Sequence, residues 1–204
     1  DSRLKIREAT VGFISFCPMF LGNIFQQFYN IADSIVAGQF LGVRALAAIG
    51  STGSLMFFVT GWLNGLSSGF AILVAQWFGA KKYDRMRHYV AMSIYLMVAF
   101  AVAMTIGFEI ANRPIMHLMN YSEEIMPDVT SYMGIIYAGL IVTAAYNALA
   151  AFLRALGDSK SPLYFLIISA AINVLLDIVF IIYVGMGVEG CAYATVIAQA
   201  ISAI

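Results

Sequence analysis

The sequence predicts an all-α fold, a polytopic membrane bundle of six transmembrane helices. Hydrophobic residues make up 62% of its 204 residues and charged residues only 11%, against roughly a quarter in soluble domains. The mean hydropathy is +0.87. A soluble protein of this composition could not cover its surface with polar groups, so we expect the lipid bilayer as its solvent. The formal net charge of zero argues against a nucleic-acid partner.

Apolar stretches of the length that a helix needs to cross a bilayer, about 20 residues, follow one another along the chain. We expect spans at 9–39, 46–78, 88–110, 125–153, 163–184 and 190–204, the last still running where the chain stops. Short connections predict antiparallel neighbours, and therefore one transmembrane unit over residues 1–204 with no soluble domain. Because the chain starts without Met and stops inside an apolar run, we expect it to belong to a longer chain.

Basic residues are divided unequally between the two sides of the predicted bundle. Two of the eleven, Arg44 and Arg113, fall on one side. The other nine are Arg3, Lys5, Arg7, Lys81, Lys82, Arg85, Arg87, Arg154 and Lys160. Loops rich in Lys and Arg stay in the cytoplasm. The N-terminus is therefore expected in the cytoplasm, with the protein as a multi-pass component of the cell (inner) membrane.

The first span carries a polar stripe on one helical face, formed by Asn23, Gln26, Asn30 and Asp33. A charged side chain costs several kcal/mol inside a membrane, so an intramembrane Asp is a functional-site hypothesis. Pro18 removes a backbone hydrogen bond from the same helix and predicts a bend, which is either a static kink or a moving part.

Three further spans place polar groups at the depth of Asp33. These groups are Asn173 and Asp177 in the fifth span, Tyr132 in the fourth and Thr195 in the sixth. Two carboxylates at one depth in a low-dielectric site cannot both stay charged without help. Either at least one of them takes up a proton or a cation lies between them. In the alternative, each Asp pairs with a donor on a neighbouring helix. No Lys, Arg or His lies at that depth in these spans, which favours ion or proton coupling.

Several motifs, taken in order, resemble the N-terminal lobe of the MATE (multidrug and toxic compound extrusion) transporters over essentially the whole chain. The motifs are Pro18 followed by DSIVAGQFLG at 33–42, AAIG at 47–50, LVAQWFGA at 73–80, RALGD at 154–158 with Pro162, Asn173 with Asp177, and GVEGCA at 187–192 with Thr195. Any one of them is weak, and the specificity comes from their order and spacing.

The resemblance implies a fold of twelve helices in two six-helix lobes, so a C-terminal six-helix lobe is expected as a partner outside this chain. It also implies a cation-coupled antiporter, driven by H⁺ or Na⁺, that exports small amphipathic and often cationic drug-like compounds by alternating access. Such a protein is no enzyme and needs no cofactor beyond the coupling ion.

The resemblance assigns roles to individual residues as well. The ion-coupling site would comprise Asp33, Asn173, Asp177 and Thr195, a possible Na⁺ site, with Tyr132 in its hydrogen-bond network. Pro18 would be the gating bend. The substrate cavity would be lined by Gln26, Asn30 and Asn147.

Three other functions remain open at this point. A lipid-linked precursor flippase of related fold should carry Arg or Lys clusters within its spans for a pyrophosphate, and this sequence has none. An intramembrane aspartyl protease usually has a Gly-x-Gly-Asp context, whereas Asp177 follows Asn-Val-Leu-Leu. In a purely structural six-helix subunit, Asp33 and Asp177 could be replaced without loss of function.

Overall fold

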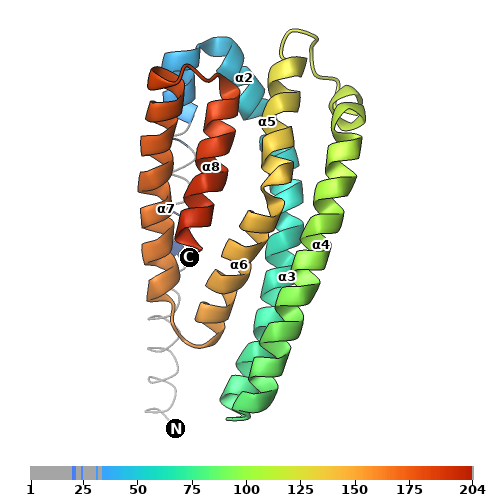
Figure 1. Ribbon diagram of the computed structural model, residues 1–204, viewed down its shortest axis with the longest axis vertical. Helices are drawn as coiled ribbons and strands as arrows, with labels where there is room; N and C mark the ends of the chain where they lie inside the picture. The colour runs from blue at the N-terminus through green and yellow to red at the C-terminus, as the bar shows by residue number, and fades with distance from the viewer. Residues whose placement is uncertain (1–19, 22–23, 25–30, 32–33, 204) are drawn as a thin grey trace, which may run out of the picture.

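The structure is a computed structural model, which describes residues 20, 21, 24, 31 and 34–203. Throughout the described part the regular structure is helical, without strands (Figure 1). Residues 34–41 are helical and precede the labelled elements. These are α2 (Val43–Ser51), α3 (Gly53–Gly79), α4 (Tyr83–Leu118), α5 (Met126–Ala138), α6 (Leu140–Ala155), α7 (Lys160–Ile178), the π-helix η1 (Val179–Tyr183) and α8 (Val188–Ser202).

Among the described residues, three helices are long and apolar enough to cross a membrane. They run over Val43–Gly79, Tyr83–Leu118 and Lys160–Tyr183, and the α5–α6 pair adds a fourth if it is one bent span. This architecture confirms the expected all-α membrane bundle. α4 extends beyond the expected 88–110 at both ends. Most of the expected span 9–39 lies outside the described residues.

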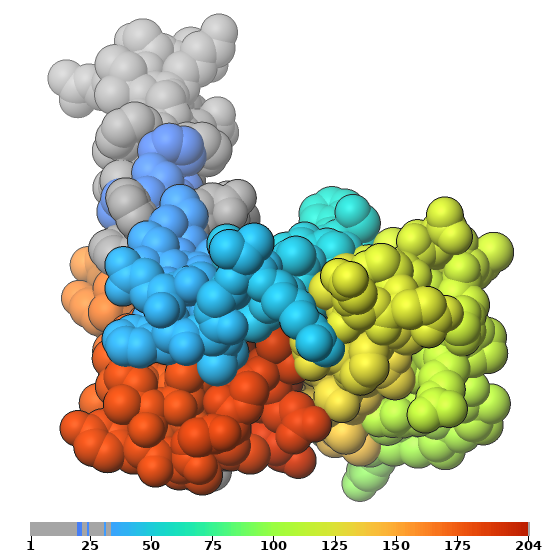
Figure 2. Space-filling view, turned by 90° about the horizontal axis from the view of Figure 1, so that it is seen from above, coloured from blue at the N-terminus to red at the C-terminus, as the bar shows by residue number. Residues whose placement is uncertain are grey.

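The helices form two antiparallel pairs joined by the α5–α6 span (Figure 1). α3 packs on α4 and α6, whereas α7 packs on α8, and α5 contacts both α4 and α8. Between α3 and α4, the Ser67 hydroxyl lies 3.9 Å from the sulfur of Met97. Seen from above, α2 reaches from the α7–α8 pair to α5 (Figure 2). The turn into α2 uses Gly42 at φ 87°, a left-handed conformation that favours glycine.

The span from Met126 to Ala155 bends by 51° at Gly139. A Cβ atom at Gly139 would overlap the side chain of Val196 on α8, so only glycine lets the two helices approach this closely. At the bend, the carbonyl of Tyr137 accepts a 2.9 Å hydrogen bond from the Thr105 hydroxyl of α4. Partners from two neighbouring helices therefore hold the bend in place.

Candidate functional site

The buried face of α7 is polar. Apart from Pro162, its buried residues are Ser169, Asn173 and Asp177, spaced one helical turn apart. Asn173 and Asp177 are 0% exposed, whereas the neighbouring apolar Leu175 is 61% exposed. A helix that turns apolar side chains outward and polar ones inward is the arrangement expected of a membrane protein with a functional interior.

Asn173 joins α7 to α8. Its side-chain Nδ2 donates a hydrogen bond of 3.2 Å to the hydroxyl oxygen of Thr195, which is 9% exposed. The Oδ1 atom of Asn173 is buried and accepts no hydrogen bond from any described residue. Burying a carbonyl oxygen without a hydrogen-bond donor costs free energy, because the oxygen loses its hydration. A cation or a proton donor beside this atom would offset that cost.

Asp177 lies in the last turn of α7, immediately before the π-helix η1. Single π-helical turns within α-helices frequently occur at functional sites. α8 packs tightly against this segment, because a Cβ atom at Gly190 would lie only 3.2 Å from the Cβ atoms of Phe180 and Met186. Asp177 is therefore held at a point where the helix changes its winding and is covered by the next helix.

The other residues predicted for the ion site, the bend and the substrate cavity do not belong to α7 or α8. Tyr132 is buried on α5, the helix that packs against α8, and Asn147 is half-buried on α6. The other four predicted site residues lie outside the described residues, so their roles stay predictions: Pro18, Gln26, Asn30 and Asp33.

Ser169 and the π-helix were not recognised in the sequence. Ser169 stands four residues before Asn173, so the same spacing that links Asn173 to Asp177 could have identified it. The sequence contains no comparable signal for η1, where the amide of Val184 bonds the carbonyl of Val179 at 3.0 Å.

The chemistry of this group suits H⁺ or Na⁺. Carboxylate, amide and hydroxyl oxygens from Asp177, Asn173 and Thr195 are hard donors of the kind that coordinate such ions within transporters. A carboxylate in a low-dielectric interior is stable only when it is protonated, hydrogen-bonded or matched by a cation. These oxygens are thus the ligand types that a bound small cation would require.

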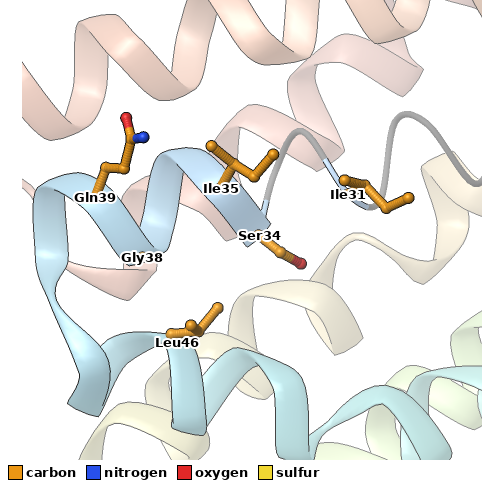
Figure 3. Close-up of a pocket in the computed structure, with 6 residues that line it drawn as sticks. All are labelled: Ile31, Ser34, Ile35, Gly38, Gln39 and Leu46. Carbon is orange, nitrogen blue, oxygen red and sulfur yellow. The ribbon is translucent and has the colours of Figure 1, made fainter.

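An open pocket of about 520 Å³ lies between α2 and the preceding residues Ile31 and 34–39 (Figure 3). Leu46 extends from α2 toward Gly38, where an added Cβ would lie 3.3 Å from its Cδ2 atom (Figure 3). The described lining of the pocket consists of Ile31, Ser34, Ile35, Gly38, Gln39 and Leu46. Asn147 does not belong to this lining, so the pocket and the predicted substrate cavity share no described residue.

The family of the chain follows from comparison with known proteins. A model of the MatE family matches residues 18–179, which include α2 to α7 and therefore Asn173 and Asp177. The chain belongs to the MatE family. The resemblance seen in the sequence motifs is thereby confirmed, and MATE proteins are multidrug efflux transporters of the membrane.

Curated relatives carry the same description. The chain is 33% identical over 184 residues to the probable multidrug resistance protein YoeA of Bacillus subtilis, covering 88% of the chain and 40% of that protein. It is 28% identical to the probable multidrug resistance protein NorM of Geobacillus kaustophilus, covering 92% of the chain and 42% of that protein. The chain spans about 40% of the length of the relatives that it matches.

Solved MATE structures share the fold. A MOP superfamily transporter from Pyrococcus furiosus, whose description notes a reverse polarity of its binding pocket, matches with a TM-score of 0.87 and 26% identity. That match covers 95% of this chain and 42% of the other. An inward-facing multidrug resistance MATE transporter matches with a TM-score of 0.82 and 26% identity, over 87% and 40% of the two chains.

Proposed function

We propose that this chain is the N-terminal lobe of a cation-coupled multidrug efflux antiporter in the cell membrane. Its substrates would be amphipathic, often cationic compounds, and its N-terminus would lie in the cytoplasm. Membership of the MatE family supports the transport class. The coverage of about 40% of each relative supports a single lobe, completed by a second six-helix lobe.

The polar buried face of α7 is the observation that best supports the proposed ion coupling. Asn173 and Asp177 are fully buried there, and the Oδ1 atom of Asn173 has no hydrogen-bond donor among the described residues. A carboxylate and a carbonyl oxygen kept together in an apolar bundle cost free energy, which a bound H⁺ or Na⁺ would offset.

In the proposed cycle, Asp33 and Asp177 accept the coupling ion from outside while the transporter is open outward. Neutralising these carboxylates changes the hydrogen bonds around Asn173 and Thr195, and the first span bends at Pro18. The cavity then expels its substrate, and release of the ion to the cytoplasm resets the protein. The ion acts because it binds one conformation more tightly than the other.

The test uses the full-length transporter in proteoliposomes loaded with ethidium, with an imposed H⁺ or Na⁺ gradient. Asp177→Asn and Asp33→Asn keep the side-chain volume but remove the charge, so each should abolish gradient-driven efflux while insertion stays normal. Glu123→Gln, in the exposed connection before α5, is the matched control and should transport like the parent. Efflux at the parental rate in both Asp variants would refute the coupling mechanism.

A further inference from the structure

The connection between α3 and α4, together with the start of α4, is the most basic exposed surface in the described part of the chain. It carries Lys81, Lys82, Arg85 and Arg87 against a single acid, Asp84. All five residues are exposed, and the connection forms the lower end of the bundle in Figure 1. Like charges so close together repel one another, so this surface favours an anionic partner.

Two of these cations are stacked on one aromatic ring. The Nζ atom of Lys82 lies 5.7 Å from the centre of the Trp77 ring, and the Cζ atom of Arg85 lies 5.1 Å from it. The Tyr89 ring stacks on Trp77 at 5.6 Å with an interplanar angle of 14°. Lys82, Arg85 and Tyr89 share one face of the start of α4 because they are spaced by three and four residues.

These two cations have no carboxylate partner among the described residues. The ion pair within the described part of the chain joins Arg44 of α2 to Asp128 of α5, away from these cations. Attraction to an aromatic face engages the charge of a guanidinium but leaves its N–H donors free in the plane of the group. Trp77 therefore holds Lys82 and Arg85 against one ring while their donors stay open to a phosphate, for which Arg is especially suited.

We propose that Trp77, Lys82, Arg85 and Tyr89, hereafter the Trp77 cluster, bind the phosphate headgroup of an anionic phospholipid. A membrane lipid is favoured over a soluble phosphate because the cluster lies where two membrane-spanning helices end, at Gly79 and Tyr83. Trp and Tyr are the side chains that concentrate at this depth of a bilayer. Exposed apolar side chains adjoin the cluster and would face the acyl chains: Ile72, Leu73, Phe78 and Tyr83.

The chain offers an internal reporter for this site. These 204 residues contain two tryptophans, and Trp62 is 56% exposed on α3, so Trp62→Phe should leave the fold intact. In the full-length transporter, Phe also replaces any tryptophan of the second lobe, so that Trp77 is the sole indole fluorophore. This variant is reconstituted into phosphatidylcholine vesicles that contain phosphatidylglycerol. Bromine atoms, which quench tryptophan on contact, are placed near the headgroup of one lipid or the other, and circular dichroism verifies the helix content of each variant.

Brominated phosphatidylglycerol should quench Trp77 more strongly than brominated phosphatidylcholine at equal mole fraction. Diffuse attraction to an anionic surface contributes at most about fivefold per cation, whereas a hydrogen bond to a charged headgroup contributes about tenfold or more. Lys82→Gln or Arg85→Gln should therefore each lower the preference about tenfold, and raising the salt concentration should lower it as well. Arg87→Gln removes the same charge from the same connection without touching Trp77, and it should change the preference much less.

Three outcomes would overturn the proposal. Equal quenching by the two brominated lipids would show that Trp77 contacts no selected headgroup. Equal losses in Arg85→Gln and Arg87→Gln would show diffuse attraction to the charged surface instead of a site. Full competition by millimolar inorganic phosphate would identify a soluble phosphate as the ligand. None of these outcomes bears on ion coupling, because the described coupling residues lie on α5, α7 and α8.

Discussion

Asn173 and Thr195 are joined by a hydrogen bond of 3.2 Å between the amide Nδ2 and the hydroxyl Oγ1. This bond links α7 to α8 one helical turn from Asp177. It also leaves the opposite side of the Asn173 amide, its Oδ1 atom, without a donor among the described residues. The geometry thus fixes the orientation of one candidate ion ligand through a residue on another helix.

Thr195→Val should destabilise the protein. Valine keeps the shape of threonine but removes the acceptor, so the buried Nδ2 donor of Asn173 loses its partner at a cost of about 1–3 kcal/mol. Thr195→Ser keeps the hydroxyl and serves as the control. Thermal unfolding in detergent measures the difference, and equal midpoints for the Val and Ser variants would contradict the assigned role of the hydroxyl.

Gly139→Ala should also destabilise the protein, because the added methyl group would overlap Val196. Overpacking of this kind costs about 1–3 kcal/mol. Val196→Ala removes the obstructing methyl groups, so the double variant should recover part of the loss caused by Gly139→Ala alone. Stability losses that simply add in the double variant, or that exceed the sum of the two single losses, would show that the contact is not the cause.

Asp158 should titrate below its ordinary pKa of 3.8, because its carboxylate accepts hydrogen bonds from the hydroxyl and the backbone N–H of Ser161. A lowered folded-state pKa means that this stabilisation is complete above 3.8 and is lost as the pH falls through the lower value. Chemical shifts of the Ser161 amide against pH follow the titration. Ser161→Ala should raise the pKa of Asp158, and an unchanged pKa would contradict this explanation.

Arg44→Gln should change stability little. The ion pair of Arg44 with Asp128 is 2.9 Å long, but the two side chains are 60% and 30% exposed. Exposed ion pairs contribute at most about 1 kcal/mol, and salt weakens them. A midpoint of thermal unfolding close to that of the parent, with the small difference vanishing at high salt, is the expected result. A large loss that persists at high salt would mean that Arg44 has another role.

Hydropathy was sufficient to predict the class of the fold, since apolar stretches of bilayer length are a local property of the sequence. The spacing of Asn173 and Asp177 was equally visible, because residues four apart share a helical face. The bend at Gly139 was not foreseen. Glycine alone does not bend a helix, and the side chain that a Cβ here would overlap, Val196, lies 57 positions away in the sequence.

The π-helix after Asp177 was not foreseen either. Its residues, Val179–Tyr183, are apolar and would suit an ordinary α-helix. The close approach of Gly190 to Phe180 and Met186 across the following turn depends on the geometry of that turn, which the apolar pattern does not encode. The predicted roles of Pro18 and Asp33 depend on residues outside the described part, and they stay predictions.

Thr195 and Val196 are consecutive residues of α8 that contact two different helical spans. The first accepts the hydrogen bond from Asn173, and the second fills the space that Gly139 leaves at the bend. One candidate ion ligand, Thr195, is therefore the sequence neighbour of the residue that packs at the Gly139 bend of the α5–α6 span. A rotation of α8 that breaks the bond at Thr195 would therefore also move the side chain that packs against Gly139.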